Sequence, residues 1–140
     1  MKLLIIEDNK DLRGIYQHNF EAAGHTVATA DNGLDGLNAA VEFQPDTVLL
    51  DIMTPEMDGY GFLAALHNNT SLTPFVVACS NISQTNDIEA TKQAGAHVFL
   101  RKSDYVGAEL IKAVEEAYAA RDTTPQEVIE EPAPIDDEQF

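Results

Sequence analysis

Hydrophobic residues in this chain gather in short apolar runs, and a polar break follows each run. Short runs rich in Val, Ile and Leu are typical of buried strands. The segments between them carry apolar residues three or four positions apart, which indicates one buried helix face. The pattern therefore predicts strands at residues 2–6, 25–30, 46–50, 74–79 and 97–100.

Helical spacing is clear in four of the intervening segments. Their apolar faces consist of Leu12, Ile15, Tyr16 and Phe20; Leu34, Leu37 and Val41; Phe62, Leu63 and Leu66; and Leu110, Val114, Ala117 and Tyr118. The segment 84–94 is less regular, because its face rests on Ile88 with the small Ala90 and Ala94. Gly95 would end that helix, since glycine readily adopts the left-handed conformation found after a last turn.

Strands and helices alternate along most of the chain. Such alternation is typical of a parallel sheet with right-handed crossovers and helices on both faces. The near-continuous apolar strands fit burial on both faces. Ligands of these open sheets bind beyond the carboxyl ends of the strands, where the strand order reverses. Because Glu7 and Asp8 follow the first predicted strand and Asp51 follows the third, we expect a site at this edge.

Length and charge narrow the range of functions. A chain of 140 residues fits one ordinary domain with a single core. Its net charge of −16, without any Lys or Arg cluster, argues against nucleic acid or an anionic membrane as partner. Signals would then pass through protein contacts.

The single cysteine, Cys79, suits a reducing compartment and is most simply a core residue. The apolar run 3–6 is too short for a signal peptide or membrane span, so we expect a cytoplasmic protein.

The composition changes near residue 122. Residues 122–140 contain seven acidic residues, three prolines and no basic residue. Such a segment does not bury enough apolar surface to fold alone. We therefore expect a folded domain at 1–121 and an acidic tail at 122–140. The tail is most simply a solvated linker or solubility segment, and a docking peptide around Val128, Ile129 or Phe140 is the alternative.

Three carboxylates are expected to share the carboxyl edge of the sheet. If the first and third strands are neighbours, Glu7, Asp8 and Asp51 converge, and their repulsion calls for a hard cation. Mg²⁺ is the natural occupant because it prefers oxygen ligands and keeps waters that a phosphate oxygen can replace. Each residue also has a plainer explanation: Asp8 or Asn9 would cap the following helix, and Glu7 would be a solvated loop residue.

Two further side chains are expected at the same edge. Ser80 ends the fourth predicted strand, and Lys102 follows the fifth. An aspartate, a divalent metal, a lysine and a hydroxyl are the minimal equipment for phosphoryl transfer to a carboxylate. We therefore expect Asp51 to take up a phosphoryl group as an acyl phosphate. In the plainer explanation, Ser80 caps the next helix and Lys102 is a surface lysine.

In these features the sequence resembles the receiver domains of two-component response regulators, over roughly residues 1–120. The matching motifs are "IIEDN" for the acidic pair, "LLDIMTPEMDG" for the phosphoacceptor loop, "VVACS" for the hydroxyl and "GAHVFLRK" for an aromatic position and the lysine. The order and spacing of the four motifs carry the resemblance. It implies a doubly wound α/β fold with a five-stranded parallel sheet of flavodoxin-like order 2-1-3-4-5 and helices on both faces.

The resemblance also implies roles for individual residues. Glu7, Asp8, Asp51 and the backbone carbonyl of Met53 would bind Mg²⁺, and Asp51 would accept phosphate from a kinase histidine. Ser80 and Lys102 would bind the phosphoryl oxygens. Phe99 occupies the position of a family aromatic that changes rotamer when the hydroxyl residue moves; judged by the sequence alone, it is a core aromatic.

The chain departs from the family pattern at two positions. Ser103 replaces the usual proline after the lysine, which is commonly joined through a cis peptide bond. A cis bond before a residue other than proline costs about 2.5–4 kcal/mol, so we expect a trans Lys102–Ser103 bond and a greater distance between Lys102 and Asp51. Asn81 replaces a small residue and would narrow the access of phosphodonors.

We expect a stand-alone phospho-switch similar to the chemotaxis regulators. A sensor histidine kinase or histidine phosphotransfer protein would be the upstream partner, and an effector protein the downstream one. The chemistry of the switch itself would be Mg²⁺-dependent self-phosphorylation followed by slow autodephosphorylation. The dephosphorylation would be slow because Met53 and Ile82 do not orient a hydrolytic water. The alternatives are a degenerate receiver that binds constitutively and a phosphatase of the haloacid dehalogenase type. The latter normally has a second aspartate where this chain has Met53.

Overall fold

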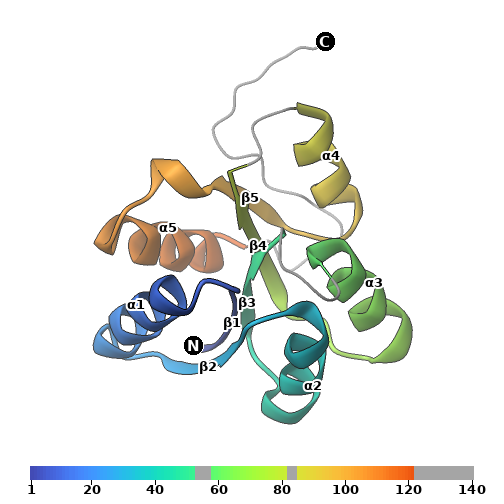
Figure 1. Cartoon of the computed structure of the whole chain (residues 1–140), viewed down its shortest axis with the longest axis horizontal. Helices are drawn as coiled ribbons and strands as arrows, with labels where there is room; N and C mark the ends of the chain where they lie inside the picture. The colour runs from blue at the N-terminus through green and yellow to red at the C-terminus, as the bar shows by residue number, and fades with distance from the viewer. Residues whose placement is uncertain (53–57, 82–84, 122–140) are drawn as a thin grey trace.

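Five parallel strands form one sheet in the part of the chain that the structure describes (Figure 1). The computed structural model describes residues 1–52, 58–81 and 85–121. The strands are β1 (Lys2–Ile6), β2 (Thr26–Ala30), β3 (Thr47–Asp51), β4 (Phe75–Ser80) and β5 (Val98–Arg101). Their order is β2-β1-β3-β4-β5. The predicted doubly wound, flavodoxin-like sheet is therefore confirmed.

Helices connect the strands and cover both faces of the sheet (Figure 1). They are α1 (Lys10–Ala22), α2 (Gly33–Phe43), α3 (Gly59–Asn69), α4 (Thr85–Gln93) and α5 (Ala108–Ala119). The weakly patterned α4 ends just before Gly95, whose φ of 125° is in the left-handed region. A short 3-10 helix, η1 (Lys102–Asp104), was not expected from the sequence. It gives the chain a tight turn directly after β5.

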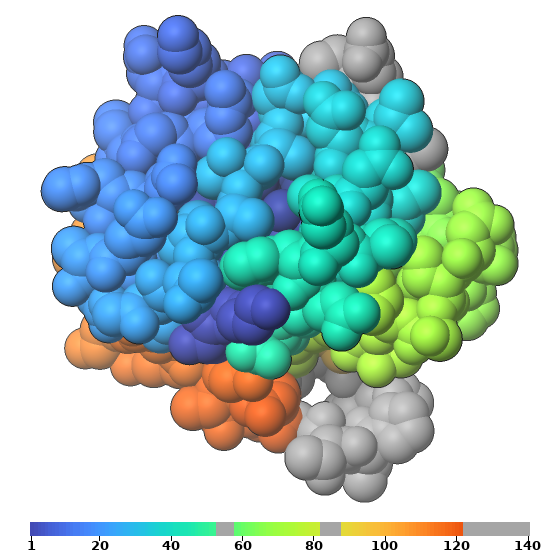
Figure 2. All heavy atoms as spheres, turned by 90° about the horizontal axis from the view of Figure 1, so that it is seen from below, coloured from blue at the N-terminus to red at the C-terminus, as the bar shows by residue number. Residues whose placement is uncertain are grey.

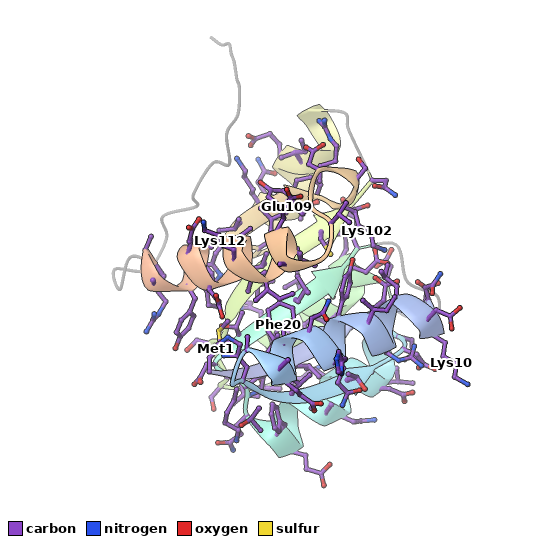
Figure 3. The ribbon with its side chains drawn as sticks, turned by 90° about the vertical axis from the view of Figure 1, so that its left-hand side faces the viewer. Met1, Lys10, Phe20, Lys102, Glu109 and Lys112 are labelled. Carbon is purple, nitrogen blue, oxygen red and sulfur yellow. The ribbon has the colours of Figure 1, made fainter. Side chains whose placement is uncertain are left out.

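Alternate residues of each strand supply two separate hydrophobic cores. On one face, strand residues such as Ile6, Leu50 and Ala78 pack with the apolar sides of α2, α3 and α4. On the other face, residues such as Ile5, Leu49 and Cys79 pack with α1 and α5. The view in Figure 3 shows α1 and α5 in front of the sheet, with Phe20 between them. Nearly every strand residue from β1, β3 and β4 is buried, as expected for a sheet covered on both faces.

The amino edge of the sheet is held by polar contacts from residues far apart in sequence. The Met1 ammonium lies 2.9 Å from Nδ1 of His25, whose Nε2 is 2.7 Å from a Glu115 carboxylate oxygen. On β5's side, the Val76 N–H donates to Nδ1 of His97 at 3.0 Å. Figure 2 looks onto the side of β2 and α2 and shows the first residues in the darkest blue, with α1 in blue on one side and α3 in green on the other. Among the described helices, none has the length and hydropathy needed to cross a membrane.

Gly59 brings the start of α3 close to the end of β3. Its N–H donates to the Ile52 carbonyl at 2.9 Å, and a Cβ on Gly59 would lie 2.7 Å from the Ile52 Cα. The Asp58 carboxylate caps the helix by accepting from the Gly61 N–H at 3.0 Å. These contacts fix where the chain enters and leaves the segment that follows Asp51.

Candidate functional site

Three carboxylates meet at the carboxyl edge of the sheet. Ile6 pairs with Leu50 in the parallel register of β1 and β3, so Glu7 and Asp51 emerge side by side. One carboxylate oxygen from each of Glu7, Asp8 and Asp51 lies within 4.8 Å of the others. Glu7 and Asp51 are buried, with 1% and 5% exposure, whereas Asp8 is exposed. The cluster therefore reaches solvent at Asp8.

Lys102 supplies the positive charge at this cluster. Its Nζ lies 2.9 Å from Oε1 of Glu7 and 3.0 Å from Oδ2 of Asp51. The side chain is only 18% exposed, so it is not an ordinary surface lysine. No peptide bond among the described residues is cis, which confirms the expected trans Lys102–Ser103 bond. The expectation that a trans bond would keep Lys102 away from Asp51 is wrong, because η1 turns the chain sharply and leaves Lys102 over the strand ends.

The electrostatics of the cluster follow from burial and pairing. Burial raises the pKa of the Glu7 carboxyl, although the hydrogen bonds from Lys102 and the Asn9 N–H act in the opposite direction. Burial by itself would lower the pKa of Lys102, but its hydrogen bonds to Glu7 and Asp51 outweigh that effect and raise it. Lys102 therefore stays charged and balances carboxylates that would otherwise repel each other.

Contacts from α1 hold the loop that carries Glu7 and Asp8. Asn9 is the N-cap of α1, with its side-chain oxygen accepting from the Leu12 N–H at 2.9 Å. Its own N–H donates to Oε2 of Glu7 at 3.1 Å. The Arg13 guanidinium donates to the Glu7 backbone carbonyl at 2.9 Å. Asn9 thus takes the capping role considered for it or Asp8, and Arg13 is a residue that sequence reasoning missed.

Ser80 and Phe99 lie on the same face of the sheet, near the cluster. Ser80 is the last residue of β4 and is 3% exposed. It precedes the first residue of α4, Thr85, by five positions and so is not its N-cap. Phe99 pairs with Ala78, two residues before Ser80, and packs into the core under α2, α3 and α4. A change at Ser80 would therefore reach this core first.

The opposite side of the site is closed by α1 and β4. Tyr16 on α1 is 7% exposed, and burial raises the pKa of its phenol to about 12. Cys79 is buried in β4, and burial likewise raises the pKa of its thiol well above the usual range. A thiol in that environment is inert, in agreement with the core role expected for it.

Several expected participants lie outside the described residues. These are Met53, with the carbonyl expected to bind metal, Ile82, and the whole segment 122–140. Asn81, which follows Ser80, is described and exposed. The division of the chain into 1–121 and 122–140, and the roles expected for Met53 and Ile82, therefore stay predictions.

The fold and the edge cluster together define a flavodoxin-like domain of the receiver type. The family model of the response regulator receiver domain matches residues 3–115, and the chain belongs to that family. It is a receiver domain of the two-component response regulators. Receiver domains as a kind interact with histidine kinases and effectors.

Relatives of known name agree with this family. The chain is 32% identical over 123 residues to the transcriptional regulatory protein PrrA of Mycobacterium bovis, a match that covers 88% of this chain and 52% of PrrA. It is 30% identical over 101 residues to the polar-differentiation response regulator DivK of Brucella anthropi, covering 71% of this chain and 82% of DivK. The chain thus spans about half the length of PrrA and most of DivK.

Solved structures support the same fold. The signal receiver domain of the putative response regulator NarL from Mycobacterium tuberculosis superposes with a TM-score of 0.75 at 28% identity, covering 86% of this chain and 97% of that one. A Francisella response regulator 1452 receiver domain gives a TM-score of 0.75 at 24% identity, covering 84% of this chain and 96% of that one.

Proposed function

We propose that this receiver domain is a phospho-switch in which Asp51 accepts a phosphoryl group from a kinase histidine. The observation that carries the proposal is the position of Lys102, whose ammonium reaches Asp51 and Glu7 at 3.0 and 2.9 Å. Phosphoryl transfer requires a nucleophile and nearby positive charge for the oxygens of the transferred group. The end of β3 supplies the first and Lys102 supplies the second.

The transfer is a single displacement at phosphorus. An Asp51 carboxylate oxygen forms the new P–O bond while the P–N bond to the donor histidine breaks, and the nitrogen leaves with the electron pair. Lys102 shifts from pairing with the free carboxylate to pairing with a phosphoryl oxygen. The Ser80 hydroxyl donates to another. Asp51 is 5% exposed and Asp8 beside it is exposed, so the donor would approach from the side of Asp8.

The three carboxylates fit a divalent cation such as Mg²⁺. All the donors are oxygens, their ligand atoms lie within 4.8 Å of one another, and Oε1 of Glu7 is a buried oxygen whose close partner is the Lys102 ammonium. Glu7, Asp8 and Asp51 would hold the ion, with the Met53 carbonyl expected as a further ligand. When bound, the cation supplies charge neutralisation between the carboxylates and the incoming phosphoryl group.

The output of the switch passes through protein contacts. Once Ser80 binds the phosphoryl group, its movement frees space on the face where Phe99 packs, and the α3–α4 side of the molecule changes shape. An effector protein, or a histidine phosphotransfer protein that takes the phosphate onward, would read that change. The sensor kinase, the lack of nucleic-acid binding and a cytoplasmic location also belong to this proposal.

Two measurements separate the proposal from its alternatives. Incubation with acetyl phosphate and Mg²⁺, followed by intact-mass measurement, should add one phosphoryl group to the wild type and none to Asp51→Asn. Chelation of Mg²⁺ should abolish the gain. An unmodified wild type would favour the constitutive binding module, and equal labelling of Asp51→Asn would rule out Asp51 as the acceptor. A phosphatase of the haloacid dehalogenase type has no support from the family match.

A further inference from the structure

The peptide unit between Glu7 and Asp8 is where a side chain of α1 contacts the backbone of the acidic cluster. Glu7 is fixed at every polar group: its N–H donates to the Ala30 carbonyl at 3.0 Å, and its carboxylate meets the Asn9 N–H and Lys102. The remaining group, the Glu7 carbonyl, accepts from Arg13 at 2.9 Å. Asp8 is exposed, so no packing of its own side chain determines where its carboxylate points.

Arg13 bonds to the chain on both sides of Asp8. Its side chain holds the Glu7 carbonyl, and its backbone N–H donates to the Asn9 carbonyl at 2.8 Å. The orientation of the Glu7 carbonyl and that of Asp8 are linked, because a peptide unit is planar and turns as one body. With both flanking carbonyls fixed, the backbone of Asp8 has little freedom to turn. That restraint sets the Cα–Cβ bond of Asp8, the point from which its carboxylate reaches to within 4.8 Å of those of Glu7 and Asp51.

We propose that Arg13 is a positioning residue for the metal site, acting through the Glu7–Asp8 peptide unit rather than by touching the metal or the phosphoryl group. This inference rests on the proposed function, since it assumes that Asp8 is a metal ligand. Groups that orient metal ligands typically change metal affinity by about tenfold or more when they are removed.

Whether replacement of Arg13 raises or lowers the Mg²⁺ affinity distinguishes a positioning role from charge repulsion alone. Removing a cation near a Mg²⁺ site should tighten metal binding, because like charges repel. Loss of positioning should weaken it. Arg13→Ala removes both the charge and the hydrogen bond, so weaker binding would show that the hydrogen bond dominates. Lys10→Ala is the matched control, since Lys10 is an exposed cation in the first turn of the same helix.

The test is calorimetric titration of the full chain with MgCl₂ alone, followed by phosphorylation with acetyl phosphate at saturating Mg²⁺. Arg13→Ala should bind Mg²⁺ about tenfold more weakly, with a phosphorylation rate at saturation within about twofold of the wild type. Arg13→Lys, which keeps a donor, should recover part of the affinity. Lys10→Ala should bind as tightly as the wild type or more tightly.

Each contrary result has a definite meaning. Equal or tighter binding by Arg13→Ala overturns the inference, and so does a rate that stays low when Mg²⁺ is saturating. Unfolding by urea without Mg²⁺ shows whether Arg13→Ala is folded. If it is not, Arg13→Lys and Arg13→Met decide, because methionine has a similar length but no N–H donor; the inference fails if the lysine variant binds Mg²⁺ no better than the methionine variant. A wild type that binds no Mg²⁺ would instead contradict the proposed function itself.

Discussion

The ammonium of Lys102 lies 3.0 Å from Oδ2 of Asp51, while the peptide bond that follows Lys102 is trans. The same ammonium also contacts Glu7, so in the free protein one cation occupies the space between two proposed metal ligands. Lys102 and a divalent cation would then compete for the same oxygens before phosphorylation and cooperate after it.

Replacement of Lys102 should therefore separate metal binding from chemistry. In Lys102→Met, Mg²⁺ should bind at least as tightly as in the wild type, because the competing ammonium is gone. Phosphorylation by acetyl phosphate at saturating Mg²⁺ should slow by about a hundredfold, as when one stabilising donor is removed from a transition state. Calorimetry and time-resolved mass measurement give the two quantities. An unchanged rate would contradict the role assigned to Lys102.

Gly59→Ala should destabilise the protein. The new Cβ would lie 2.7 Å from the Cα of Ile52, which has no room to move without shifting β3. Overpacking of this kind costs about 1–3 kcal/mol of unfolding free energy, measured by urea titration. Gly14→Ala is the matched control: that glycine is inside α1 with nothing within 4 Å of its added Cβ, so the substitution should stabilise by about 0.5–1 kcal/mol. Equal changes in the free energy of unfolding for the two variants would contradict the claim that the contact with Ile52 leaves no room for a Cβ at Gly59.

His97 should make stability depend on pH. Its Nδ1 accepts from the Val76 N–H, which requires a neutral ring, and burial lowers the pKa of the imidazole below its ordinary 6.5. Above that value both folded and unfolded chains carry neutral His97, so the contribution is fully present. As the pH falls below about 6.5, the unfolded chain binds the proton first, and the free energy of unfolding decreases.

The check is urea unfolding of the wild type and His97→Asn between about pH 7.5 and pH 5. Asparagine keeps an acceptor but does not titrate, so the variant should lose stability less steeply than the wild type as the pH falls. His67→Asn, at an exposed position on α3, serves as the control. Parallel curves for the wild type and His97→Asn would show that His97 is not responsible.

An exposed isoleucine on α1 should affect the rate of phosphoryl transfer from protein donors but not from small-molecule donors. Ile15 is 52% exposed in the half of α1 nearer the acidic cluster, and Val41 is equally exposed in the last turn of α2, at the other end of the molecule. Ile15→Asp should slow transfer from a phosphohistidine protein by about tenfold, a typical loss at an apolar contact. Acetyl phosphate should phosphorylate Ile15→Asp at the wild-type rate. If Val41→Asp slows transfer as much, the docking face is not specific to α1.

The sequence predicted the strands well, since near-continuous apolar runs require burial on both faces. It also brought Glu7 and Asp51 to one edge, because parallel strands end on the same side. The role of Arg13 was not visible, since a side chain that bonds to a backbone carbonyl six residues away leaves no periodic pattern. The distance between Lys102 and Asp51 was misjudged for a related reason: it depends on the turn at η1, which no motif indicated.

Among the described residues, the sheet divides the interior into two cores with separate sets of side chains. Ser80 and Phe99 both belong to the side of α2, α3 and α4, whereas α1 and α5 rest on the other. A rearrangement that begins at Ser80 therefore has a direction: it can remodel one half of the surface while the other keeps its shape. A phosphodonor protein that binds α1 would contact the same surface before and after transfer. Its dissociation would then depend on the change in charge at Asp51 and not on a change in the shape of the docking surface.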